Sequence, residues 1–167
     1  NNFNFNNIKC PSPSKSNEQG ANAIFVKGSS TTAINNITIS GCKLKNIVAG
    51  HSEVISVDGN CTNITIKDTS VTSSDLKGNI GICICGNYGT CSNKSLDRPR
   101  HVTISNCNVS NCKSPYDPGS AYGIYVDGGE DVKIFNNVVT NCEGGIEIGA
   151  EQHNSHLSGR ETENIKV

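Results

Sequence analysis

The stretch AYGIYVDGGEDVKIFNNVVTNCEGGIEIGAE, residues 121–151, contains one short phrase twice. GIYVDG begins at Gly123, and GIEIGA begins 22 residues later at Gly145. Both phrases place apolar residues at alternate positions, the pattern of a short β-strand with one buried face. DVKIFNNVV, which lies between them, shows the same alternation. A chain that repeats its strands in the same order predicts a repeat architecture.

Both kinds of phrase recur along the whole chain. DVKIFNNVV aligns with NITISGCKL, NITIKDTSV and HVTISNCNV, and GIYVDG aligns with AIFVKG, VISVDG and GICICG. The first inward residues of successive copies are separated by 27, 38, 30 and 33 residues; they are Ile37, Ile64, Val102, Val132 and Ile165. Constant strands with connections of variable length predict a solenoid, in which each coil buries its apolar row against the next.

Two longer connections interrupt the repeat. One covers about residues 85–100 and the other residues 113–121, which are rich in Pro and Gly. Loops inserted on a rigid scaffold often carry function. With these two insertions, residues 1–167 are predicted to form a single domain.

Composition supports an all-β fold and excludes several classes of partner. Only 34% of the residues are hydrophobic, and Met and Trp are absent. Val, Ile and Thr dominate the apolar runs, with Gly and Asn between them, which favours short strands and tight turns. The net charge is −1 and no basic stripe is present, so we expect no nucleic-acid partner. No apolar run approaches the 18 residues of a membrane span.

The repeat resembles the right-handed parallel β-helix of the pectate-lyase-like superfamily, whose members include pectate lyases, polygalacturonases, and alginate and chondroitin lyases. The resemblance covers Phe3 to Val167 and implies an all-β solenoid of about five coils. Right-handed crossovers between parallel strands are the general rule. Both ends fall inside a coil, so we expect a segment of a longer helix with flanking coils or caps.

In this superfamily ligands bind in a groove along one sheet, which the resemblance assigns to the GIYVDG phrase. Its outward residues form two columns, which we predict to face solvent. The first column is Phe25, Ser56, Cys83, Tyr125 and Glu147, and the second is Lys27, Asp58, Cys85, Asp127 and Gly149.

Acidic residues gather at the end of these columns. Asp127 and Glu147 lie on a diagonal of roughly 7–8 Å, within the range for two carboxylates that flank a glycosidic bond with a water between them. We predict Asp127, Glu147 and Glu151 as catalytic residues, with Tyr125, His153, Arg160 and Asp58 binding the substrate. The substrate would be a polysaccharide, and the location the cell surface or the outside of the cell.

The reaction type stays open between a glycoside hydrolase, a polysaccharide lyase and an epimerase. Polygalacturonases carry Asp just before such strands, where this chain has Ile80, Tyr122 and Gly144. Pectate lyases use a calcium-binding acidic cluster and a basic residue. Calcium is therefore a possible cofactor at Asp127, Glu147 and Glu151, with Arg160 as the base.

A non-catalytic role is the alternative. The chain would then be a surface, adhesion or glycan-binding scaffold. An enzyme would bring its acids together in a groove walled by the two insertions, whereas a scaffold would leave them dispersed and solvated. A trimeric fibre would show apolar outward patches, and the outward columns here are mostly polar.

Nine cysteines leave at least one thiol unpaired in a monomer. Cys112 and Cys142 stack within disulfide reach, but we expect them to act as buried apolar thiols. Cys85 and Cys91 are expected to form a disulfide that closes the first insertion. A zinc site at Cys83, Cys85 and Cys91 would require a fourth ligand. Asn46, Asn111 and Asn141 are expected to bond to one another through their amides along the stack.

Overall fold

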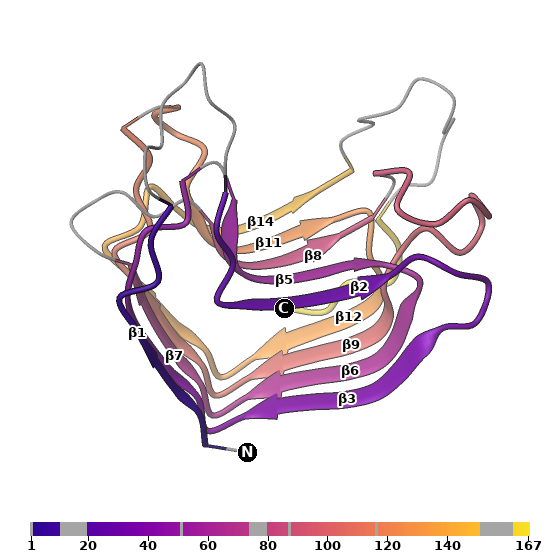
Figure 1. Cartoon of the computed structure of the whole chain (residues 1–167), viewed down its shortest axis with the longest axis horizontal. Helices are drawn as coiled ribbons and strands as arrows, with labels where there is room; N and C mark the ends of the chain where they lie inside the picture. Colours follow the sequence, from indigo (N-terminus) through magenta and orange to yellow (C-terminus); the bar gives the residue numbers. More distant parts are fainter. Residues whose placement is uncertain are drawn as a thin grey trace.

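The computed structural model describes residues 2–10, 20–50, 52–73, 80–86, 88–115, 117–150 and 162–167. These residues form three parallel sheets wound as a solenoid, seen nearly end-on in Figure 1. The first sheet is β1 (Asn4–Asn6), β4 (Lys43–Ile47), β7 (Ser70–Ser73), β10 (Asn108–Ser110) and β13 (Val138–Thr140). The second is β2 (Ile24–Gly28), β5 (Glu53–Gly59), β8 (Ile80–Cys85), β11 (Tyr122–Asp127) and β14 (Gly144–Gly149). The third is β3 (Ile34–Ser40), β6 (Cys61–Lys67), β9 (Arg100–Ser105) and β12 (Glu130–Phe135).

Each coil contributes one strand to each sheet in the same order, so the sheets are stacks of equivalent strands. The GIYVDG phrase and its copies form the strands of the second sheet. The DVKIFNNVV phrase and its copies each form a strand of the third sheet followed by a strand of the first sheet. The predicted all-β parallel helix is confirmed. Among the described residues no helix has the length and apolar character needed to cross a bilayer.

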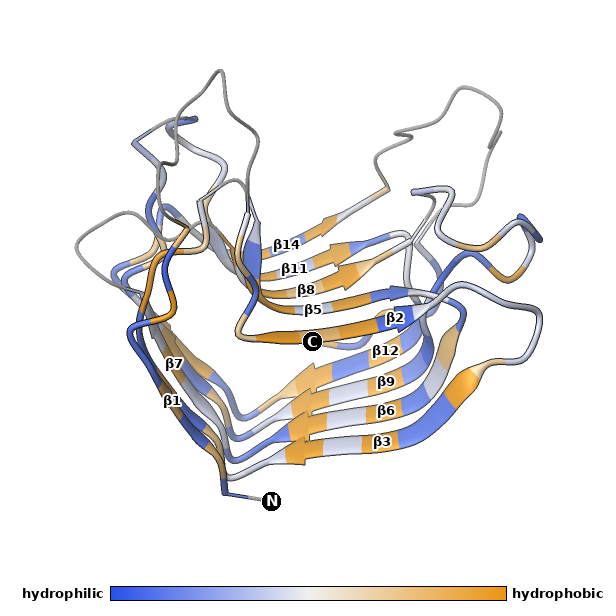
Figure 2. Ribbon diagram, in the orientation of Figure 1, coloured by the Kyte–Doolittle hydropathy of each residue, from blue (hydrophilic) through white to orange (hydrophobic). Residues whose placement is uncertain are grey.

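The core is made of inward apolar columns. In the third sheet Ile37, Ile64, Val102 and Val132 pair along one column, and Ile39, Ile66, Ile104 and Ile134 pair along the next. Leu44, Val71, Val109 and Val139 do the same in the first sheet. Figure 2 shows these positions as bands of apolar colour that line up across β3, β6, β9 and β12. Most of these side chains are fully buried, and their hydrophobic burial provides the main driving force for folding.

Glycine is required where two sheets approach most closely. A Cβ at Gly123, at the start of β11, would overlap the side chain of Val139 in the first sheet. This close approach explains the Gly that precedes Ile in the GIYVDG phrase.

The corners of the coil use the left-handed backbone region. The residue before the inward Ile or Val of the third sheet has φ between 52° and 57° in each coil; these residues are Asn36, Asn63, His101, Asp131 and Asn164. Asn and Asp tolerate this region better than other residues that carry a Cβ. The abundance of Asn in the sequence therefore follows from the number of corners.

The predicted asparagine stack is confirmed for Asn111 and Asn141, while Asn46 bonds to a different residue, Asn6. The Asn141 side-chain amide donates to Asn111 Oδ1 at 2.7 Å, and the Asn46 amide donates to Asn6 Oδ1 at 3.0 Å. The Asn111–Asn141 bond joins equivalent residues of neighbouring coils, whereas Asn46 bonds to the residue in register with Lys45. Both bonds join successive coils and so reinforce the stack.

The core columns make a prediction about stability. Ile104→Ala should lower the free energy of unfolding by about 2–5 kcal/mol, because it leaves a cavity between fully buried neighbours. The adjacent Thr103→Ala, on the outward face, should change it by less than about 0.5 kcal/mol. Urea denaturation of both variants provides the measurement, and equal effects would contradict the assigned faces.

Candidate functional site

The outer face of the second sheet has the register that the sequence predicted. Phe25, Ser56, Cys83, Tyr125 and Glu147 pair across the five strands, as do Lys27, Asp58, Cys85, Asp127 and Gly149. Asp127 and Glu147 therefore occupy diagonal positions on β11 and β14. Both predicted columns are confirmed.

The prediction that these columns face solvent is wrong for their central members. Asp127 is 0% exposed, Ser56 1% and Tyr125 5%, and both cysteines are buried. The physical reason is that loops rise at both ends of this sheet and flank its outer face (Figure 1). The outer face of the second sheet is thus a largely buried environment in its central strands.

A cavity of about 440 Å³ lies on this face. Its sheet residues are Glu53, Ile80, Tyr122, Tyr125 and Glu147. Tyr88 of the first insertion and residues 117–120 of the second insertion also line it. Both insertions therefore wall one cavity that contains carboxylates and tyrosines.

The second insertion is held by one carboxylate of the following coil. Glu143 Oε2 accepts hydrogen bonds from the backbone N–H groups of Gly119 at 2.9 Å and Ala121 at 3.2 Å. Glu143 Oε1 accepts a third from Ser114 at 3.2 Å. These bonds fix the loop that carries Asp117 and Ser120 to the cavity wall.

The first insertion is held from within and from the next coils. Asp97 accepts the backbone N–H groups of Gly89 at 2.6 Å and Cys91 at 2.9 Å. Arg98 is fully buried and pairs with Glu130 at 3.6 Å and Glu163 at 3.4 Å. A charged group so deeply buried needs such partners. The loop that carries Tyr88 is therefore anchored to the scaffold at its far end.

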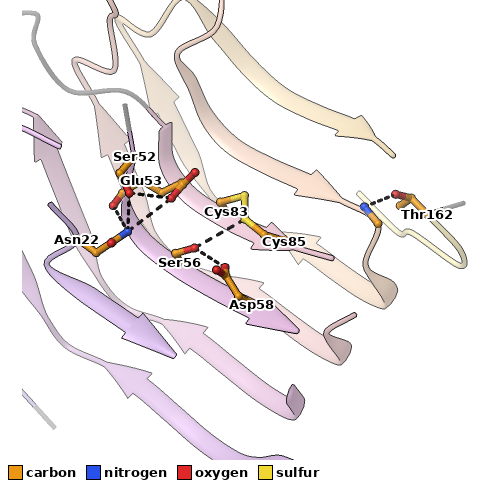
Figure 3. The surroundings of a disulfide bond; sticks show 9 residues. Asn22, Ser52, Glu53, Ser56, Asp58, Cys83, Cys85 and Thr162 are labelled. Atoms are coloured by element: carbon orange, nitrogen blue, oxygen red, sulfur yellow. Dashed lines mark hydrogen bonds between the residues drawn. A yellow bond between two sulfur atoms is a disulfide. The ribbon is translucent and has the colours of Figure 1, made fainter. Parts of the chain in front are cut away.

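Glu53 is a cavity carboxylate that the sequence did not single out. Its Oε2 accepts a hydrogen bond from Ser52 Oγ at 3.1 Å, and the Asn22 amide lies 3.5 Å from the same oxygen (Figure 3). Burial raises the pKa of Glu53, and the charge of Asp127 raises that pKa further. The carboxyl of Glu53 is thus biased towards its protonated form.

Glu53 was missed because the strand alternation slips. Val54 and Ile55 are both fully buried in the core, so two successive residues of β5 point inward. Strict alternation from Ile55 would also have turned Glu53 inward. A glutamate cannot be accommodated in an apolar core without a partner, and this was the signal available in the sequence.

Asp58 lies on the same strand but outside the cavity lining. Ser56 Oγ donates to its Oδ1 at 2.6 Å. Burial raises the pKa of Asp58 to about 6, and the Glu53 charge adds to the effect, while the Ser56 hydrogen bond opposes it. Asp58 is absent from the residues that line the cavity, and its predicted role in substrate binding stays a prediction.

The remaining predicted residues divide into three groups. Tyr125 and Glu147 line the cavity as expected. Asp127 is on the same sheet but fully buried and outside the lining. Glu151, His153 and Arg160 lie outside the described residues. The calcium site expected at Asp127, Glu147 and Glu151 stays a prediction, because Glu151 lies outside the described residues.

The cysteine pairing differs from the expectation. Cys83 forms a disulfide with Cys85, two residues away on β8, and Cys91 is a buried free thiol. The predicted Cys85–Cys91 bond is wrong because alternate residues of one strand project on the same face, which brings Cys83 and Cys85 together. Cys112 and Cys142 are free thiols, as expected.

A family model described as "Right handed beta helix region" matches residues 22–163. The chain belongs to the right-handed β-helix family. This β-helix is also similar to the uncharacterized protein YwoF of Bacillus subtilis (strain 168), with 30% identity over 127 residues. The similarity covers 74% of the chain and 26% of YwoF, so the chain spans about a quarter of that relative's length. No solved structure matches this β-helix.

The anchoring of the second insertion can be tested at Glu143. Glu143→Ala removes the acceptor of three backbone N–H groups. The loss of these bonds should remove roughly 1–3 kcal/mol of local stabilisation. The amides of Gly119 and Ala121 should therefore exchange with solvent at least about tenfold faster. Hydrogen–deuterium exchange measures this. Exchange in β6 serves as the internal control, and unchanged exchange in residues 117–121 would contradict the assigned role.

The pKa of Asp58 predicts a pH dependence. Because that pKa is raised from 3.8 to about 6 in the folded chain, folding is favoured by proton binding. The stabilisation is present below about pH 4 and is lost as the pH rises through about 6. Asp58→Asn should remove this dependence and raise stability at pH 7 by up to about 3 kcal/mol. Denaturation from pH 4 to 7 provides the measurement, and parallel curves for the two proteins would contradict the shift.

Proposed function

We propose that this β-helix binds a polysaccharide in the cavity on the outer face of the second sheet and cleaves it. The observation that carries the proposal is the cavity itself. Tyr88 and Asp117, from two insertions at opposite ends of the strands, line the same space as Glu53 and Glu147. A scaffold that only spaces other domains has no need to gather acids and aromatic rings in one walled space.

The aromatic side chains fit a sugar. Tyr122 and Tyr125 have ring centroids 5.9 Å apart, and the more exposed Tyr88 lies across the cavity from the sheet. Tyrosine combines an apolar ring with a polar hydroxyl, which suits the mixed surface of a sugar ring. Asp117 and Ser120 supply polar groups at the wall.

We assign the general acid and the general base to two different carboxyl groups of the cavity, Glu53 and Glu147. Glu53 has a raised pKa because of its burial, so we assign it as the proton donor to the leaving oxygen. Glu147 is the other sheet carboxylate in the cavity and is assigned as the base. Their strands are three positions apart in the sheet, and Glu53 lies three residues before Ser56, the residue in register with Glu147. Their backbones are therefore roughly 17 Å apart. This span leaves room for a sugar ring between the two side chains.

A polysaccharide substrate also implies a location. Such substrates are found in cell walls and extracellular matrices, and the Cys83–Cys85 disulfide fits an oxidising compartment. We therefore propose that the protein is secreted or held at the cell surface. The resemblance to the pectate-lyase-like superfamily is in keeping with both proposals.

The test is cleavage of a panel of acidic and neutral polysaccharides, with calcium and with a chelator. Glu53→Gln and Glu147→Gln should each lower the rate by about 100-fold or more. The matched control is Asp68→Asn, which neutralises an exposed carboxylate whose Oδ1 accepts a hydrogen bond from Asn106.

The products identify the reaction. New reducing ends without ultraviolet absorbance indicate hydrolysis, and an absorbing unsaturated end indicates elimination. Binding without cleavage by the wild-type chain would overturn the catalytic proposal in favour of a glycan-binding scaffold. Equal loss in Asp68→Asn would overturn the assignment of the cavity carboxyls.

A further inference from the structure

Two sulfur atoms and a carboxylate meet on the outer face of the second sheet. The Sγ atoms of Cys83 and Cys85 and a carboxylate oxygen of Glu53 all lie within 4.8 Å of one another. The three residues are on adjacent strands, β8 and β5, and Figure 3 shows the Glu53 side chain directed towards the disulfide. The polysaccharide proposal makes no use of the two sulfurs.

The strand ladder holds the two cysteines whether or not they are bonded. Cys83 pairs with Ser56 and Tyr125, and Cys85 pairs with Asp58 and Asp127. The disulfide spans a single intervening residue, so its reduction frees very little chain. The reduced thiols therefore remain side by side on the same face, next to Glu53.

We propose that in the reduced protein Cys83, Cys85 and Glu53 form a three-ligand site for Zn²⁺. Zinc–sulfur bonds of about 2.3 Å and zinc–oxygen bonds of about 2.1 Å in a tetrahedron separate the ligand atoms by roughly 3.5–3.8 Å. The observed cluster already lies within 4.8 Å, so modest side-chain rotations complete the geometry. We assign the fourth position to a water molecule.

The surroundings orient these ligands. Ser52 and Asn22 both bond to Oε2 of the Glu53 carboxylate, which holds that side chain in place beside the two sulfurs. Ser56 Oγ lies 3.7 Å from Cys85 Sγ and also donates to Asp58. Such outer contacts fix ligand orientation in known metal sites.

The ligand chemistry selects the metal. Two thiolates favour Zn²⁺ and other borderline or soft ions over Ca²⁺ and Mg²⁺, which take oxygen ligands. Three protein ligands with one open position is the arrangement of zinc sites that keep a water. The site therefore differs from the calcium site that the sequence resemblance implied.

A phosphine can reduce the Cys83–Cys85 disulfide before zinc binds. The phosphine supplies two electrons to the Cys83–Cys85 bond and takes oxygen from water to become the phosphine oxide. Each sulfur receives one proton as the S–S bond breaks. Zn²⁺ then binds both thiolates and releases the two protons. In the oxidised protein the sulfurs are bonded to each other and the site is closed to metal.

The test uses Co²⁺ as a spectroscopic substitute for Zn²⁺ on the full chain. Phosphine-reduced protein should bind Co²⁺ with a thiolate charge-transfer band and intense tetrahedral visible bands, and Zn²⁺ should displace it. Oxidised wild-type protein should show neither band, and this comparison requires no variant. Cys83→Ser and Cys85→Ser should lose the two-thiolate spectrum, and Glu53→Gln should weaken Co²⁺ affinity by at least about tenfold.

The matched control is the double variant Cys112→Ser with Cys142→Ser, which removes the other stacked thiol pair. It should bind Co²⁺ as the wild type does. Absence of the bands in reduced wild-type protein would overturn the proposal, as would their persistence in Cys83→Ser or their loss in the double variant. The readout is metal binding alone, so it is independent of any polysaccharide cleavage.

Discussion

The parallel hydrogen-bonded ladder between successive coils is the constraint on which the other features depend. It pairs each residue with its equivalent one coil away, at the spacing of neighbouring strands. Any residue type that recurs in the repeat therefore becomes a column in space. Inward columns of Ile and Val form the core, and a polar residue in such a column would be buried with its equivalents.

The same rule places outward residues in columns, so the chemistry of one face is the sum of single residues contributed by coils far apart in the sequence. Glu53 and Glu147, nearly a hundred residues apart, share one cavity for this reason.

The ladder also explains how a variable chain keeps a constant cross-section. Most left-handed residues are Asn, Asp or Gly, and His101 is an exception. Additional residues extend from the coil as loops. Two of these loops flank the second sheet, and each is anchored by charged groups, Glu143 for one and Asp97 with Arg98 for the other. Anchored loops convert an open face into a walled space. Burial on this face raises the pKa of Glu53 and Asp58.

The sequence could predict whatever follows from the repeat. The fold, the inward columns, the asparagine stack and the outward register of Tyr125 and Glu147 all follow from aligning copies. It could not predict features that depend on departures from the repeat. Two successive residues of β5, Val54 and Ile55, point inward, so strict alternation does not place Glu53 on the outer face. The burial of the outer face depends on how far the insertions reach across it. The predicted Cys85–Cys91 pairing was wrong because the alternation within β8 places Cys83 beside Cys85.

The distribution of acids among the sheets separates a requirement of the fold from a requirement of the site. On the third sheet the outward column through Thr38, Thr65, Thr103 and Lys133 contains no carboxylate, and the coils stack there without one. On the second sheet the equivalent outward positions hold buried acids whose raised pKa values show that burial disfavours their charged forms. Buried charge without full compensation lowers stability, so packing alone gives no reason for acids on this face. Glu53 lines the cavity, and both the glycan-cleaving and the metal-binding proposals converge on this residue.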